Sequence, residues 1–520
     1  MDQRQNNATK TISFVMVITL LGKVLGLYRD RLLAIHYSTG MEANAFFTAS
    51  RIPRVFFDAV FASAIAACFI PVFSEYLEKK GKKEAFRFAG NFITVITLLT
   101  AALTALGMVF PQPLVALFAD YADPQTTALA ISLTRVMFPT VLFSGLAFSL
   151  VGVLQAQDHF TAPALMSAVS NVVIIVYFFL LDEKLGIYGL AAAYLVGWLL
   201  QGLIQIPPLG RLGYQFQPVF RFRTEGMKKV FALMGPVMVS TWVQPINLVI
   251  NSRFGSRLYG GAGVSALEYS TNLYLVIAGT FILSITNVIF PRLSRLTAGG
   301  QQNAFRNTLR QTLHSSLFFV LPMSVGLMVV ARPLISFIYG GGEFDTFSIH
   351  ITSTGLFWVS LGMAGYAIQN ILSRAYFARQ DGRTPLIAGA VSIGANILLC
   401  LALVDRFEVA GLALSSAVSS TVYALLLLLP MQRGGDGVLD RAMMADLAKM
   451  LLASAAMGIC ASGALSLLTA LLPTGKVGEL LALGLCAFAG LAIYFLLALA
   501  LNLQEARLSV QMIKQLRKRG

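Results

Sequence analysis

Long apolar stretches separated by short polar segments run through the whole chain, which is the pattern of helices that cross a membrane repeatedly. A helix needs about 20 mostly apolar residues to span a bilayer, and on that criterion we expect about fourteen spans. The expected spans are residues 11–36, 44–76, 86–110, 127–155, 160–181, 187–209, 228–254, 262–291, 308–331, 348–377, 385–404, 409–431, 445–471 and 478–502. The second is broken by Pro53 and Pro71, which predicts a kink.

Composition agrees with this pattern. Of the 520 residues, 57% are hydrophobic and only 12% are charged. Soluble domains carry about twice that charged fraction, so we expect an all-α polytopic membrane protein. The first apolar segment is not followed by a small-residue cleavage site, and we expect it to remain as the first span.

Basic residues alternate with the spans along the chain. They are concentrated after spans two, six, eight and ten and in the C-terminal tail, whereas the loops after spans three, five and nine contain few of them. Positive residues favour the cytoplasmic side, so we expect both termini there and a basic amphipathic tail on the inner leaflet. The net charge of +15 therefore reflects cytoplasmic loops and not a nucleic-acid partner.

The chain also repeats itself at an offset of roughly 220 residues, which indicates two copies of one six-helix unit. The matching segments are 70–74 with 290–294, 157–171 with 380–396, and 189–191 with 411–413. Six helices preserve orientation, so the copies are parallel, and substrate sites of such transporters lie between repeats. We predict an N-terminal lobe over 1–220, a C-terminal lobe over 221–435, and two extra helices with a basic cytoplasmic tail over 436–520.

Motifs for enzyme chemistry are absent from the sequence. It contains no Walker A, HExxH, GxSxG or paired-cysteine motif, and its four cysteines all lie in apolar runs. We therefore expect a chain that is not an enzyme.

The first two spans carry an unusual number of charges for membrane helices. These are Lys23, Arg29, Asp30, Arg51 and Arg54, among others. A charge inside a span usually faces the bundle interior or a water-filled cavity, and arginine binds phosphate in a bidentate manner. The stretch therefore favours a cationic cavity for a pyrophosphate. The alternative is internal pairing, in which Arg29 binds Asp30 or Asp58 and only holds helices together.

The same stretch resembles the opening of the MurJ/MviN family of lipid II flippases, which belongs to the multidrug/oligosaccharidyl-lipid/polysaccharide (MOP) superfamily. The similar segments are 21–34 (LGKVLGLYRDRLLA), 40–53 (GMEANAFFTASRIP), 69–76, 234–256, 290–296 and 378–385. The resemblance implies two six-helix lobes plus two helices in the bacterial cytoplasmic membrane. It also implies alternating access that moves the undecaprenyl-pyrophosphate-linked peptidoglycan precursor lipid II to the outer leaflet.

Several positions depart from the pattern of the family. Lys23 and Asn44 replace an arginine and an aspartate, and Asn272 replaces an arginine of span eight. Phe57 stands where an arginine is expected, and Arg54, one turn earlier, is a candidate to take over. We count Lys23, Asn44, Arg54 and Asn272 with Arg29, Asp30 and Arg51 as candidate substrate-binding residues.

The energy source is less clearly indicated. The family's cation site maps onto Asn251 and Asn396, with Cys400 where a carboxylate is expected, which argues against sodium coupling. We expect no bound cofactor, and the membrane potential is the other candidate driving force.

Three other functions compete with lipid II transport. They are export of another polyprenyl-linked oligosaccharide, drug/cation antiport, and a scaffold that recruits cell-wall synthesis enzymes. Cationic drugs need buried carboxylates, and the opening helices carry more Arg and Lys than Asp and Glu. The expected partners are thus lipid II or a related saccharide, membrane lipids and cell-wall enzymes.

Overall fold

The computed structural model forms two compact units, residues 1–265 and 266–520. No β-strand occurs in the part of the chain that it describes, where Gly341 and Phe344 form only an isolated bridge. The described residues are 2–57, 65–433, 437–473 and 475–507. The basic tail from residue 508 onward and Asp58 lie outside them.

The first unit begins with a long helix that carries the charged residues Lys23, Arg29 and Asp30. Its helices are α1 (Asp2–Tyr37), α2 (Met41–Phe57), η2 (Ile65–Phe69), α3 (Ile70–Lys79), α4 (Gly81–Val109), α5 (Pro111–Phe118), α6 (Pro124–Met137), α7 (Thr140–Gln155), α8 (Thr161–Leu180), α9 (Asp182–Leu203), α10 (Ile206–Arg211), α11 (Glu225–Thr241), α12 (Val243–Gly255) and η3 (Tyr259–Gly261). Helix α13 (Ala262–Tyr274) begins at the end of this unit.

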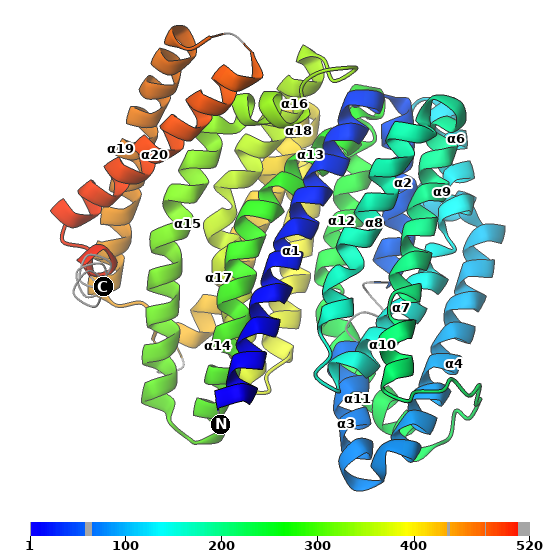
Figure 1. The fold of residues 1–520 in the computed structure, drawn as a ribbon. Coiled ribbons are helices and arrows are strands. Elements are labelled where there is room, and N and C mark those ends of the chain that lie inside the picture. Colours follow the sequence, from blue (N-terminus) through cyan, green and yellow to red (C-terminus); the bar gives the residue numbers. More distant parts are fainter. Residues whose placement is uncertain (1, 58–64, 434–436, 474, 508–520) are drawn as a thin grey trace. The chain divides into compact units, whose positions relative to one another are not determined.

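Within this unit, α1 packs along α8, and α8 packs in turn on α9. Helix α2 packs on α6, and α4 packs on α7. The start of α1 lies at the same end as the turn between α3 and α4, which contains the basic segment 79–87 (Figure 1). The packing of α1 on α8 decides the surroundings of Arg29.

The second unit contains the remaining helices. They are η4 (Leu275–Gly279), α14 (Thr280–Ala298), α15 (Gln302–Tyr339), α16 (Thr346–Leu361), α17 (Met363–Ala378), α18 (Arg383–Arg433), α19 (Arg441–Leu471) and α20 (Lys476–Ala500). Helices α19 and α20 form a hairpin, and both pack on α15 (Figure 1).

Nine helical segments of the described residues are long and apolar enough to cross a membrane, or ten if α16 and α17, bent by 49°, form one span. Helix α18 counts once but is broken at Glu408, which has φ 51°. The charged helix α1, the partly described second span, and the pair α11–α12 are not among the segments counted in the described residues. The structure is thus consistent with the expected count of about fourteen.

Backbone conformation supports the internal repeat. Residues with left-handed φ values recur as pairs roughly 220 residues apart, as two copies of one unit require. The pairs are Ser38 with Tyr259, Gly81 with Gly300, Asp158 with Gln380, and Gly186 with Glu408. The turns of the first six spans therefore recur in the next six.

A closely packed glycine follows the last of these pairs in each copy. A Cβ atom on Gly189 would lie 2.4 Å from the Cβ of Leu185, and one on Gly411 would lie 2.5 Å from the carbonyl oxygen of Leu403. Both glycines are required because the chain reverses directly in front of them.

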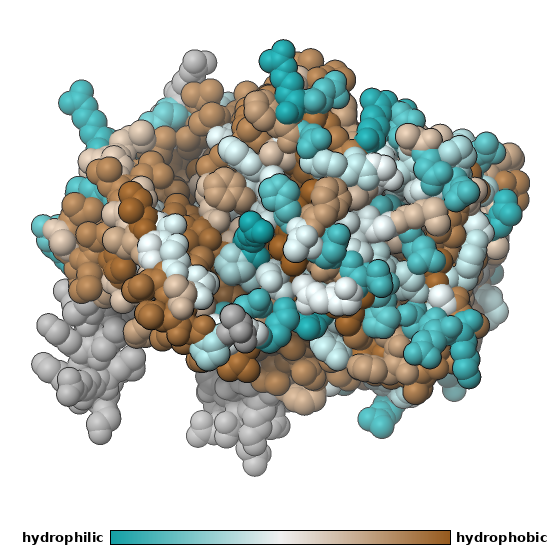
Figure 2. Space-filling model, turned by 90° about the horizontal axis from the view of Figure 1, so that it is seen from above, coloured by the Kyte–Doolittle hydropathy of each residue, from teal (hydrophilic) through white to brown (hydrophobic). Residues whose placement is uncertain are grey.

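Exposed hydrophobic side chains cover much of the helices' flanks. Figure 2 shows large hydrophobic areas beside hydrophilic ones at one end of the molecule. Ile459 on α19 and Phe488 on α20 are 76% and 73% exposed, as expected for contact with lipid. The all-helical polytopic fold is confirmed, while the lobe boundaries at 220 and 435 stay predictions.

Candidate functional site

The guanidinium of Arg29, in the last third of α1, is held by two neighbours. Its Nε and Nη2 donate to Oδ1 of Asp30 at 2.9 and 2.6 Å, and its Nη1 donates to Oδ1 of Asn171 at 3.0 Å. Asp30 is only 7% exposed, whereas the Arg29 side chain keeps 27% exposure. The internal pairing of Arg29 with Asp30 therefore exists, and it leaves the arginine side chain partly accessible.

Asn171 was not among the residues that the sequence indicated as a site. It lies on α8, is 3% exposed, and donates from Nδ2 to the carbonyl oxygen of Gly22 at 3.0 Å. A polar side chain inside the apolar run of span five was the available signal. Lys23, also on α1, is half-buried.

Asn44 at the start of α2 binds backbone groups at both ends of its amide. Nδ2 donates to the carbonyl oxygen of Thr39 at 2.9 Å, and Oδ1 accepts from the Ser265 N–H at 3.2 Å. Asn44 is 1% exposed. It thus connects α2 with the loop before it and with the first turn of α13.

The two arginines of α2 lie in different surroundings. Arg51 is 3% exposed and its charge acts on Tyr121, whereas Arg54 is exposed. The Tyr121 hydroxyl bonds Thr48 at 2.6 Å and donates to the carbonyl oxygen of Asn44 at 2.9 Å. Burial raises the pKa of Tyr121, which keeps the phenol protonated.

Phe57 is 4% exposed and packs in an aromatic cluster. Its ring centroid lies 5.0 Å from that of Phe148 and 6.4 Å from that of Trp198. An arginine at this position would be surrounded by aromatic rings and not by water. The environment therefore suits the apolar side chain of Phe57.

The remaining predicted residues are divided between the two units. Asn251 is half-buried on α12 of the first unit, and Asn272 is half-buried on α13 in the second. Asn396 on α18 is 1% exposed, and the Cys400 thiol lies 3.9 Å from its Oδ1. Within the described part of the chain, no group of three His, Cys, Asp or Glu side chains could hold a metal ion.

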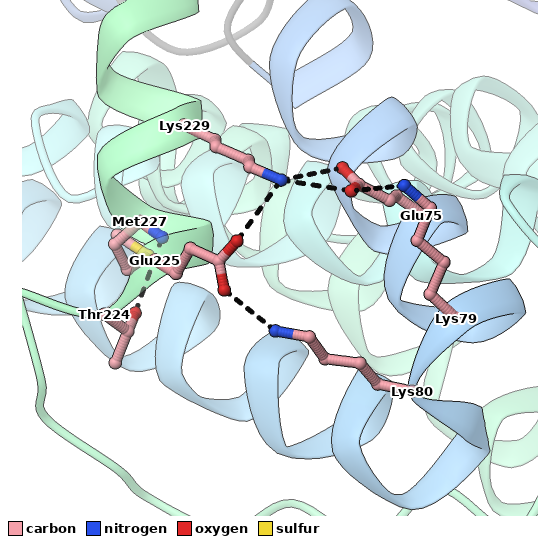
Figure 3. Close-up of polar contacts among 7 residues, drawn as sticks. All are labelled: Glu75, Lys79, Lys80, Thr224, Glu225, Met227 and Lys229. Carbon is pink, nitrogen blue, oxygen red and sulfur yellow. Dashed lines mark hydrogen bonds and ion pairs between the residues drawn. The ribbon is translucent and has the colours of Figure 1, made fainter.

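An ionic network joins α3 to the start of α11 (Figure 3). Lys229 binds both oxygens of Glu75, at 3.0 and 3.2 Å, and lies 3.5 Å from Glu225, which also binds Lys80 at 2.9 Å. The hydrogen bonds from Lys229 and Lys79 lower the pKa of Glu75, and those from Lys80 lower the pKa of Glu225. The sequence showed these charges only as a basic loop.

A second ionic contact fixes the end of α12. Arg257 donates from Nε and Nη2 to Oδ2 of Asp120 at 3.0 and 2.7 Å, and Arg253 lies 3.8 Å from the same oxygen. The Glu75 network attaches the start of α11 to α3, and this contact attaches the end of α12 to the loop after α5. Both halves of span seven are thus held by other parts of the first unit. Asp120 thus pairs with both arginines at the end of α12.

In the second unit, His314 on α15 lies between two carboxylates. Its Nδ1 contacts Glu505 after α20, and its Nε2 lies 3.4 Å from Asp446 of α19. Lys449 binds Asp446 at 2.9 Å. The two carboxylates are far from His314 along the chain, so the sequence alone does not bring the three residues together.

Comparisons with known proteins agree with the family resemblance of the sequence. The family model described as "Lipid II flippase MurJ" matches residues 34–486. A "Probable lipid II flippase MurJ" of Buchnera aphidicola subsp. Acyrthosiphon pisum is 30% identical over 429 residues, which cover 81% of this chain and 83% of the relative. A "Lipid II flippase MurJ" of Burkholderia cenocepacia is 28% identical over 440 residues, covering 82% and 84%.

Solved structures show the same fold. "Lipid II flippase MurJ, inward closed conformation" has a TM-score of 0.77 at 24% identity, over 93% of this chain and 97% of that one. An inward-facing multidrug resistance MATE family transporter of the MOP superfamily has a TM-score of 0.66 at 14% identity, covering 82% and 98%. With a family model that spans most of its length, this chain belongs to the lipid II flippase MurJ family.

Proposed function

We propose that this chain moves lipid II from the inner to the outer leaflet of the bacterial cytoplasmic membrane. Besides family membership, one observation carries the proposal: a partly accessible arginine, Arg29, held by Asp30 and Asn171 within a membrane-crossing helix. A charge at such a position is costly and usually serves function.

The chemistry of the cargo fits this arginine. Moving a pyrophosphate through hydrocarbon without compensation is prohibitive, because an isolated charge loses its water shell there. A guanidinium replaces part of that shell through paired N–H donors, while the polyprenyl tail remains in the lipid. The chain then alternates between states that open to either side of the membrane.

The direction of transport follows from charge if the termini are cytoplasmic. The basic turn between α3 and α4 lies at the same end of the first unit as the start of α1, which supports that orientation. An inside-negative potential favours outward movement of an anion by about 2.3 kcal/mol per charge per 100 mV. We propose the membrane potential as the driving force. A cation site at Asn251 and Asn396 is the weaker candidate, since both are neutral amides.

One observation favours a second cargo. Phe57 is buried among Phe148 and Trp198, and Asn272 is neutral, so two arginines expected from the resemblance are missing. A cavity with fewer cations suits a polyprenyl-linked saccharide with fewer charges in its headgroup. Export of another polyprenyl-linked oligosaccharide is therefore the alternative.

A reconstituted transport assay separates the two cargoes. The purified chain is placed in liposomes that contain fluorescent lipid II, and the fraction that reaches the opposite leaflet is measured with and without an excess of another undecaprenyl-linked saccharide. We expect lipid II to be translocated and unlabelled lipid II to compete. Translocation of the other saccharide without competition by lipid II would replace the proposal with its alternative.

A scaffold for cell-wall enzymes would give a third result. In that case neither lipid would move, and substitution of Arg29 would leave the association of those enzymes unchanged.

A further inference from the structure

We propose that Asn171 is a positioning residue that holds the Arg29 guanidinium ready for the pyrophosphate of the cargo. This inference rests on the proposed function. It concerns a residue that would act through Arg29 and not by touching the cargo itself.

The amide of Asn171 has one possible arrangement between its partners. Arg29 can only donate, and the carbonyl oxygen of Gly22 can only accept. Oδ1 must therefore face Arg29 Nη1, at 3.0 Å, and Nδ2 must face Gly22, at 3.0 Å. Nδ2 also lies 3.4 Å from the Ser167 hydroxyl, one turn earlier on α8. An aspartate cannot donate to Gly22, and an aliphatic residue can serve neither partner.

The close packing of α1 on α8 makes this contact possible. Gly22 and Gly26 lie four residues apart on the face of α1 that meets α8, a spacing that lets helix backbones approach. A Cβ atom on Gly26 would lie 3.3 Å from Nδ2 of Asn171, and one on Gly22 would lie 3.4 Å from the Ser167 side chain. Asn171 is thus held at a fixed position relative to the backbone of α1.

The consequence for Arg29 is restraint from two directions. Asp30 accepts hydrogen bonds from Nε and Nη2 of the guanidinium, and Asn171 accepts one from Nη1. A long arginine side chain loses rotamer entropy when it is fixed. Because Asn171 and Asp30 already fix the side chain in the free protein, this entropy is not lost on binding, and the affinity for the cargo increases.

Asn91 provides a matched control in the same unit. It is also 3% exposed and also makes three hydrogen bonds, with the N–H and the carbonyl oxygen of Arg221 and with Thr224. Its partners belong to the loop before α11 and not to Arg29. Asn91→Ala therefore reports the loss of a buried asparagine without any change at Arg29.

The test measures binding of two probes, lipid II and undecaprenyl pyrophosphate, to the purified full chain in nanodiscs. The variants are Asn171→Ala, Asn91→Ala, Arg29→Ala and the double variant of Asn171 and Arg29. The melting temperature of each variant is measured as well, to show that it is folded. One hydrogen bond to a charged group contributes enough to change a dissociation constant by about tenfold or more.

We expect Asn171→Ala to weaken both probes about tenfold, Asn91→Ala to lower the melting temperature without changing affinity, and the double variant to bind no worse than Arg29→Ala. Wild-type affinity of folded Asn171→Ala would overturn the proposal. A double variant whose loss of affinity equals the product of the two single-variant losses would also overturn the proposal, because Asn171 would then act independently of Arg29.

Asn171→Asp decides the matter if the alanine variant does not fold. It keeps the volume and the acceptor for Arg29, and its negative charge competes with pyrophosphate, so weaker binding is expected and unchanged binding refutes the proposal. The proposed function is judged separately. A wild-type chain that binds undecaprenyl pyrophosphate but does not move lipid II contradicts that function, while the pyrophosphate probe still tests Asn171.

Discussion

Replacing Asn44 with alanine should destabilise the folded chain and leave its affinity for lipid II unchanged. The sequence made Asn44 a candidate substrate ligand, because it replaces an aspartate of the family pattern. In the structure its amide is fully engaged with backbone groups, donating to Thr39 and accepting from Ser265. Ser265 N–H is one of the first four amides of α13, which have no partner within their own helix.

The size of the effect follows from the two groups that lose their partner. Thr39 and Ser265 are 6% and 0% exposed, so water does not readily replace the amide. A buried donor or acceptor left without a partner costs about 1–3 kcal/mol, which gives about 2–6 kcal/mol for the pair. Asn44→Asp keeps the acceptor for Ser265 but places a buried carboxylate against the carbonyl oxygen of Thr39, so it should also destabilise the chain.

The assay is unfolding of the purified chain in detergent, followed by intrinsic fluorescence, together with binding of lipid II to the folded fraction. Asn370→Ala is the control, because the side chain of Asn370 donates to the carbonyl oxygen of Tyr366 within its own helix. It should change stability little. A folded Asn44→Ala of wild-type stability that binds lipid II at least tenfold more weakly would refute the structural role and make Asn44 a ligand.

Two further predictions concern packing and charge. Glu75 pairs with Lys229, and this pairing lowers the pKa of Glu75 below its usual value of 4.5. The pair therefore stabilises the contact between α3 and α11 fully above pH 4.5, and this stabilisation is lost as the pH falls through the lowered pKa. Labelling of a cysteine at the start of α11 should therefore increase in acid, and Glu75→Gln should show the increased labelling at neutral pH; identical labelling at all pH values would contradict the pairing. Gly365→Ala places a Cβ atom within 2.8 Å of the backbone of Thr421 and should cost about 1–3 kcal/mol, whereas Gly394→Ala, with no atom near its Cβ, should be neutral or stabilise by up to about 1 kcal/mol. Equal melting temperatures of these two variants would show that the α17–α18 contact is looser than described.

The sequence was sufficient for the fold because bilayer thickness and hydrophobicity act locally along the chain. Apolar length gave the spans, and the segments around Pro71 and Pro291 gave the repeat, which the paired left-handed turns confirm. Arg29 and Asp30 interrupt the apolar run of the first span, yet its apolar length still identifies it. Charges inside a membrane span are what indicated function there.

The site was predicted less completely, because side-chain partners depend on packing. The sequence indicated Arg29 and Asp30, but it could not show that Asn171, far along the chain, binds the same guanidinium. It also placed Arg51 and Arg54 together, whereas one is buried and the other exposed. Residues three apart on a helix share a face only broadly, and neighbouring helices decide how much water each one meets.

The most direct measurement is rescue of bacteria depleted of their own lipid II flippase, with lipid II on the outer leaflet as the readout. The wild-type chain is compared with Arg29→Ala and with Arg135→Ala, an exposed arginine that donates to the carbonyl oxygen of Met108. We predict that the wild type and Arg135→Ala restore exposure of lipid II, and that Arg29→Ala, made at equal level, does not. Full exposure of lipid II with Arg29→Ala would contradict the role of this arginine, and an inserted, folded wild type without rescue would contradict lipid II as the cargo.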